Sequence, residues 1–165
     1  MAKTTTEKLT IAGVMAALIC VATMLVQIPL PAAGGYVNLG DGLVLLAAFL
    51  LSPLYGACAA GLGAGLADLI SGYVVYVPGT VVIKAAMVLI AGLICRRGMK
   101  GKVTLARLLS CLAGECVMVL GYFVYESLVL GLGAGAAANI LANMGQGAVG
   151  IAVAMAVSAL IIKKK

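Results

Sequence analysis

The chain has 165 residues, of which 64% are hydrophobic and only 10% are charged, and its formal net charge is +6. This composition excludes a soluble domain with a polar surface and predicts an integral membrane protein. The basic residues stand in short clusters between apolar runs, a pattern typical of membrane topology, so we expect no nucleic-acid partner. The five cysteines form no C-x-x-C pair and histidine is absent, so we expect buried thiols, no metal site and no cofactor.

The apolar runs, taken in chain order, predict an all-α bundle of six transmembrane helices that forms a single domain over residues 1–165. The expected helices cover residues 9–30, 38–51, 53–71, 78–95, 103–130 and 136–162. The run from Leu43 to Ala67 allows one helix or two, and Pro53 favours two because proline disfavours helix at the residue before it. The second helix is then short, and we expect it to be tilted or partly re-entrant.

The distribution of basic residues favours six crossings over five. With six crossings and a cytoplasmic N-terminus, ten of the eleven basic residues fall on the cytoplasmic side, as the positive-inside tendency requires. These ten are Lys3, Lys8, Arg96, Arg97, Lys100, Lys102, Arg107, Lys163, Lys164 and Lys165. We therefore expect both termini to be cytoplasmic and the chain to be a multi-pass protein of a bacterial-type plasma membrane.

Polar residues gather toward the outer end of this expected bundle. In the fifth helix, Glu115, Tyr122 and Glu126 are spaced seven and four apart and so share one face. The sixth helix presents three amides on one face, and Lys84 is the only basic residue expected inside the membrane. We predict an outward-facing substrate cavity there. Its predicted binding residues are Asn38, Asp41, Asp68, Tyr73, Tyr76, Lys84, Tyr122, Glu126, Asn139, Asn143 and Gln146.

Each of these groups also has a purely structural interpretation. Lys84 could pair with Asp68 or Glu126 and close the bundle instead of contacting a solute. The amides of the sixth helix could join helices, and the two tyrosines before Pro78 could anchor the chain at the membrane interface. Glu115 lies nearer the middle of the membrane, so we expect it to be a packing or gating partner.

The order and depth of these motifs resemble the S components of energy-coupling factor (ECF) vitamin transporters, which are their substrate-binding subunits. The resemblance rests on six helices and on the following motifs: Tyr36-Val37-Asn38-Leu39-Gly40-Asp41, Ala67-Asp68-Leu69, Pro78 followed by Lys84, Gly121-Tyr122 with Glu126, and Asn139, Asn143 and Gln146. It implies that the chain captures a small vitamin-like solute and is not itself an enzyme.

The resemblance also implies partners. An S component docks on a transmembrane coupling subunit driven by two cytoplasmic ATPases, and it topples in the membrane to release its solute. The chain has no P-loop, so ATP hydrolysis would lie on those partners. Ala12 and Ala16 match the family's alanine-x-x-x-alanine docking pattern, although plain helix packing explains them equally well.

The site contains more acid than base, several amides and several tyrosines, which favours a small planar heterocycle with donor groups. We rank hydroxymethylpyrimidine or pyridoxine-like solutes first, riboflavin second, and a deazapurine precursor of modified tRNA third. The alternative from another class is a small proton-coupled exporter acting as a dimer, with Glu115 or Glu126 as the titrating carboxylate. A membrane enzyme is a third option, but no nucleophile is paired with a base.

Overall fold

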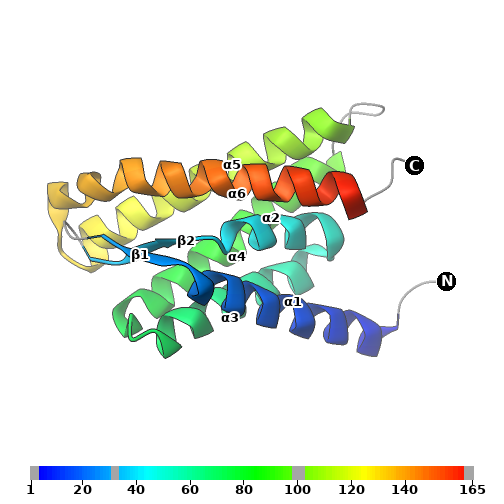
Figure 1. The fold of residues 1–165 in the computed structure, drawn as a ribbon, viewed down its shortest axis with the longest axis horizontal. Helices are drawn as coiled ribbons and strands as arrows, with labels where there is room; N and C mark the ends of the chain where they lie inside the picture. Colours follow the sequence, from blue (N-terminus) through cyan, green and yellow to red (C-terminus); the bar gives the residue numbers. More distant parts are fainter. Residues whose placement is uncertain (1–3, 31–33, 98–102, 162–165) are drawn as a thin grey trace.

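A computed structural model describes residues 4–30, 34–97 and 103–161. Within these ranges the chain forms six α-helices along one long axis, with a short two-stranded ribbon at one end (Figure 1). The α-helices are α1 (Thr5–Leu25), α2 (Asp41–Leu50), α3 (Pro53–Ile70), α4 (Val77–Arg97), α5 (Val103–Val124) and α6 (Ile140–Ile161). Strands β1 (Gln27–Pro29) and β2 (Tyr36–Asn38) form the ribbon, and the short helical turns are η1 (Val74–Tyr76), η2 (Tyr125–Val129) and η3 (Gly133–Asn139).

Five helical segments among the described residues are long and apolar enough to cross a bilayer. They are Thr5–Leu25, Pro53–Ile70, Val74–Arg97, Val103–Val129 and Gly133–Ile161. Helix α2, with 10 residues, falls well short of the roughly 20 that a spanning helix needs. The predicted helical, multi-pass membrane architecture is confirmed, whereas the sixth crossing and the cytoplasmic termini remain predictions.

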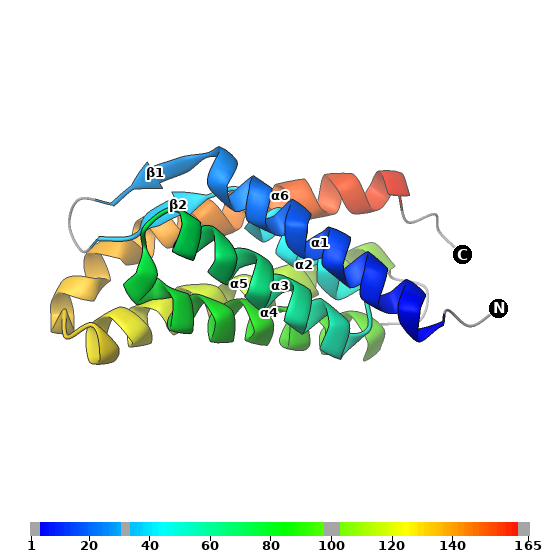
Figure 2. The same cartoon turned by 90° about the horizontal axis from the view of Figure 1, so that it is seen from below.

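The chain nevertheless runs along the bundle axis six times, because β2 and α2 together make the second pass (Figures 1 and 2). An extended residue advances about 3.3 Å against 1.5 Å in a helix, so a short strand lengthens the pass that α2 begins. The start of α1 and the end of α6 lie at the same end of the bundle, and Lys8, Arg96, Arg97 and Arg107 belong to this end. The other predicted cytoplasmic lysines, Lys3, Lys100, Lys102, Lys163, Lys164 and Lys165, lie outside the described residues.

The first predicted helix, over residues 9–30, has both of its ends wrong. Helix α1 begins at Thr5 because Thr4 and Glu7 form a capping box, in which each side chain accepts a hydrogen bond from the other residue's backbone N–H. The helix ends at Leu25, and Gln27–Pro29 pair antiparallel with Tyr36–Asn38. This ribbon also displaces the start of the second predicted helix from residue 38 to Asp41, within a fold that is otherwise helical.

Small residues let the helices approach closely. A Cβ on Gly63 of α3 would collide with the backbone carbonyl of Ala16 on α1, and a Cβ on Gly61 would lie 2.8 Å from the carbonyl oxygen of Val81 on α4. Large apolar side chains fill the centre, with Leu45 and Met87 fully buried. Close backbone contact of this kind is how helices associate in lipid, where there is little hydrophobic drive between them.

Candidate functional site

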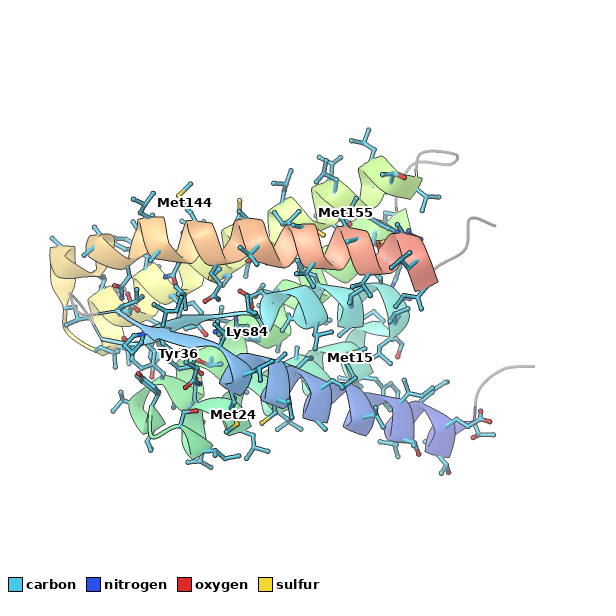
Figure 3. The ribbon with its side chains drawn as sticks, viewed as in Figure 1. Met15, Met24, Tyr36, Lys84, Met144 and Met155 are labelled. Carbon is cyan, nitrogen blue, oxygen red and sulfur yellow. The ribbon has the colours of Figure 1, made fainter. Side chains whose placement is uncertain are left out.

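Most of the predicted polar residues converge on one small cavity in the half of the bundle next to the ribbon. Tyr36 and Lys84 mark the region in Figure 3. The lining residues are Thr23, Leu30, Gly35, Tyr36, Asn38, Ala64, Asp68, Tyr76, Thr80, Lys84, Tyr122, Glu126, Asn143 and Gln146. These side chains leave a space of ≈20 Å³, about enough for one water molecule. A larger solute therefore requires the side chains to move.

Lys84 forms a buried ion pair with Asp41. The ammonium of Lys84 donates to Asp41 Oδ1, and the two side chains are 3% and 1% exposed. Gln146 Nε2 donates to the other oxygen of Asp41 at 2.6 Å, and Lys84 Nζ lies 5.5 Å from the centre of the Tyr122 ring. A buried pair of charges requires such additional hydrogen bonds, because desolvation otherwise costs more than the attraction returns.

This pairing corrects one expectation, because Lys84 pairs with Asp41 and not with Asp68 or Glu126. Asp41 is the first residue of α2 and is fully buried. A carboxylate at this position is stabilised by the positive end of the helix dipole.

The ribbon is tied to the helices by side-chain hydrogen bonds across the cavity. The backbone N–H of Asn38 donates to Gln146 Oε1 on α6 at 2.7 Å, and the Tyr36 hydroxyl donates to Asp68 Oδ1 on α3 at 2.5 Å. Burial and the adjacent Asp68 carboxylate raise the pKa of the Tyr36 hydroxyl far above its ordinary value. The phenol therefore remains a hydrogen-bond donor, and the ribbon forms one wall of the cavity.

Glu126 lies in a π-helical turn at the end of α5. In this turn the N–H of Leu130 donates to the carbonyl of Tyr125, five residues back. Glu126 Oε1 accepts hydrogen bonds from Asn139 Nδ2 at 3.0 Å and from the Tyr76 hydroxyl at 3.4 Å. Single π-turns inside helices are frequent at functional sites, and this one brings a carboxylate to the cavity wall.

Tyrosine rings form a connected aromatic wall beside these groups. The ring centres of Tyr36 and Tyr73 are 4.6 Å apart, those of Tyr73 and Tyr76 6.4 Å, and those of Tyr76 and Tyr125 6.3 Å. Rings in such tilted and edge-on arrangements can also stack on a planar solute.

Some buried carboxylate oxygens have no hydrogen-bond partner among the described residues. They are Asp68 Oδ2, Glu126 Oε2 and both oxygens of Glu115. Asp68 and Glu126 line the cavity, whereas Glu115 does not. A buried acceptor without a partner costs free energy, and the first two can accept hydrogen bonds from N–H or O–H groups that enter the cavity.

Eight of the eleven predicted site residues line the cavity: Asn38, Asp68, Tyr76, Lys84, Tyr122, Glu126, Asn143 and Gln146. The other three stand behind this lining, where Asp41 pairs with Lys84, Tyr73 packs on Tyr36, and Asn139 donates to Glu126. Their role in binding a substrate stays a prediction.

Sequence reasoning missed several lining residues, including Thr23 and Thr80, and it quoted Tyr36 only as part of a motif. The hydroxyls of Thr80 and Tyr122 are 3.0 Å apart. A signal for Thr80 existed, because it precedes Lys84 by four residues and so shares its helical face.

The two predicted docking residues face the bundle. Ala12 is only 8% exposed and belongs to the core, and Ala16 packs against that core beside Gly63. These alanines therefore hold α1 against α3, in agreement with the helix-packing interpretation of the alanine-x-x-x-alanine pattern. The exposed small residues at this level of α1 are Gly13 and Ala17.

Comparison with known proteins agrees with this geometry. A protein of Pyrococcus woesei, described as an uncharacterized protein in gap 3'region, is 41% identical over 134 residues, which are 81% of this chain and 86% of that protein. Residues 3–163 match the family described as ECF-type riboflavin transporter, S component. The match covers nearly the whole chain and confirms the resemblance inferred from the motifs. The chain therefore belongs to this S-component family, and it is a membrane-embedded subunit that captures a small-molecule substrate for an ECF transporter.

Proposed function

We propose that the chain captures a planar vitamin-like heterocycle of the flavin class in the cavity beneath the ribbon. The observation that carries this proposal is the match of residues 3–163 to a family whose description names riboflavin. The proposal moves riboflavin from second place in our ranking to first.

The chemistry of the cavity supports a flavin. The tyrosine wall offers faces on which a flat ring system can stack. Asp68 Oδ2 and Glu126 Oε2 are acceptors without partners, and the hydroxyl groups of a polyol chain are donors that match them. Asn143 and Lys84 add polar contacts for ring nitrogen and oxygen atoms.

A second candidate is a smaller heterocycle of the hydroxymethylpyrimidine or pyridoxine kind. The observation that favours it is the small space of ≈20 Å³, since a small solute displaces fewer side chains. No contact in the cavity favours the deazapurine over these two.

For delivery, we propose that the chain crosses the membrane six times as one domain with both termini in the cytoplasm, and docks on a coupling subunit driven by two ATPases. Because Ala12 is buried, the exposed face of α1 around Gly13 and Ala17 is the surface that a partner helix can reach. Small residues on such a face let another helix approach closely.

Binding can be tested by flavin fluorescence, because the chain contains no tryptophan and its tyrosines would quench a stacked flavin. Titration of riboflavin with the detergent-purified protein should give saturable quenching at one equivalent. Asn143→Ala should weaken binding, whereas Met144→Ala, at the neighbouring exposed position, should not. Absence of quenching, combined with tight binding of pyridoxine or hydroxymethylpyrimidine, would select the second candidate.

Docking can be tested by uptake in cells that express the whole transporter. Ala17→Trp should leave substrate binding unchanged and abolish uptake, because a bulky side chain blocks close helix contact. Leu120→Trp is a matched control on α5, where Leu120 is 62% exposed, and it should transport normally. Normal uptake by the Ala17→Trp variant would remove α1 from the docking surface.

A further inference from the structure

Glu115 is a buried carboxyl group that the substrate cavity does not use. It lies on α5, is 5% exposed and is absent from the cavity lining. Neither of its side-chain oxygens has a hydrogen-bond partner among the described residues. An ionised carboxylate in such a place would carry a desolvation cost with no hydrogen bond to offset it.

Two glycines of α6 form the surface against which this carboxyl group rests. A Cβ on Gly147 would lie 3.0 Å from Glu115 Oε2, and a Cβ on Gly150 would lie 2.8 Å from Oε1. The Cβ position built on Gly150 is also 2.9 Å from Cβ of Asp41, so the side chains of Glu115 and Asp41 are neighbours. The carboxyl group is thus enclosed where α5, α6 and the start of α2 meet.

The charges around Glu115 do not balance if it is ionised. Helix α2 contributes the carboxylate of Asp41, α4 contributes the ammonium of Lys84, and α5 itself contributes the thiol of Cys111. Helix α6 faces it with Gly147 and Gly150, which carry no charge. Lys84 is already paired with Asp41, so an ionised Glu115 would leave one uncompensated negative charge in the low-dielectric interior.

We propose that Glu115, together with the Asp41–Lys84 pair, forms a cation-binding site behind the substrate cavity and that its ligand is a proton on the Glu115 carboxyl group. A proton neutralises the extra charge without needing additional space, whereas the close contacts of Gly147 and Gly150 leave little space for a larger cation. The described residues contain no group of three acidic, cysteine or histidine side chains that could hold a metal ion. Intramembrane carboxyl groups without a partner are default candidates for proton binding.

The proton determines the charge that faces the substrate. With Glu115 protonated, the ammonium of Lys84 remains half of a balanced ion pair with Asp41 at the cavity wall. Loss of the proton adds a second anion behind Lys84 and makes this part of the wall net negative. The inference goes beyond substrate capture, because the site exists whichever solute the cavity binds.

Infrared spectroscopy of the purified chain tests the proposal without any substrate. At neutral pH the wild type should show the carbonyl band of a buried protonated carboxylic acid, and Glu115→Gln should lack it. Thermal stability of the wild type should fall as the pH is raised from about 4.3, where an unfolded glutamate ionises, through neutral pH, because the folded chain retains a proton that the unfolded chain releases. Glu115→Gln should flatten this dependence, and Glu115→Met should do the same if the amide perturbs folding.

Glu7→Gln is the matched control, because Glu7 is exposed and glutamine also completes a capping box. This variant should keep both the band and the pH dependence of the wild type. An unchanged band in both Glu115 variants would overturn the proposal. A second result would also overturn it: sodium chloride, but not choline chloride, stabilises the wild type at alkaline pH, and the Glu115→Gln variant no longer shows this stabilisation. The ligand would then be sodium and not a proton.

Discussion

The half of the bundle near the ribbon and the half at the opposite end hold their buried polar groups in different ways. At the opposite end, the acceptors are main-chain carbonyls: Ser110 donates to that of Ala106 at 2.6 Å, and the guanidinium of Arg107 donates to that of Ser158 on α6. Near the ribbon, the acceptors are side-chain oxygens, because Tyr36 donates to Asp68 and the N–H of Asn38 donates to Gln146. Bonds of the second kind can be exchanged for bonds to a solute without disturbing any helix.

The cores of the two halves differ accordingly. Away from the cavity, residues such as Leu46, Val88 and Cys111 fill the space by packing alone. In and behind the cavity wall, the buried side chains include four carboxyl groups and one ammonium group. The comparison teaches that this small chain separates a scaffold held mainly by packing from a site held by charge and side-chain hydrogen bonds. Three substitutions can break or sharpen that distinction.

The largest loss of stability should come from Lys84→Met. This change leaves Asp41 as a buried charge without its cation, and breaking a buried pair in this way costs about 3–5 kcal/mol. Thermal and denaturant unfolding in detergent would measure it.

The double variant Asp41→Asn with Lys84→Met is the control, because it removes both charges. It should recover most of the lost stability, since a buried pair replaced as a whole is often nearly neutral. A double variant as unstable as Lys84→Met would mean that packing, not charge, holds this part of the site.

A smaller loss should come from Tyr36→Phe, which removes the hydrogen bond to Asp68. Hydrogen bonds to charged groups contribute about 1.5–3 kcal/mol. The phenol keeps its proton in the folded state, whereas an unfolded tyrosine ionises near pH 10, so this contribution is present below about pH 10 and is lost as the pH rises further.

Unfolding measured at neutral pH and at alkaline pH checks both parts of this prediction. Tyr36→Phe should lose stability at neutral pH and show a weaker alkaline decline than the wild type. Tyr55→Phe, in the opposite half of the molecule, should behave like the wild type. Equal effects from the two variants would contradict a special role for the ribbon bond.

The smallest loss should come from Gly63→Ala in the contact between α1 and α3. The new methyl group would collide with the Ala16 carbonyl, and overpacking of this kind costs roughly 1–3 kcal/mol, partly offset by the better helix propensity of alanine. Gly13→Ala is the control, because no atom lies within 4 Å of its would-be Cβ, and it should be neutral or slightly stabilising. Loss of stability in both variants would point to a requirement for backbone flexibility instead of close packing.

Much of the scaffold could be predicted from the sequence. Helix α3 begins at Pro53 as expected, and the fifth predicted helix, over residues 103–130, agrees with α5 plus its π-turn. These boundaries follow from proline chemistry and from the lengths of apolar runs, which are local properties. The ribbon was missed because three-residue strands carry no periodicity, and their pairing depends on contacts across a turn.

The site was predictable in its membership but not in its pairings. Spacing along each helix brought out Glu126, Asn143 and Gln146, because it fixes which residues share a face. It does not determine how neighbouring helices are rotated against each other, so the partner of Lys84 was assigned wrongly. For the same reason Ala12 was expected on a docking face although its methyl group points into the core.

The small free volume of the cavity also has a consequence for rates. A substrate cannot fill a space of ≈20 Å³ until lining side chains move, so association includes an internal rearrangement as well as diffusion. The observed association rate should then level off as the substrate concentration rises, at the rate of that rearrangement. Because departure requires the reverse step, a slow rearrangement would give long residence times even to a solute that makes only modest contacts.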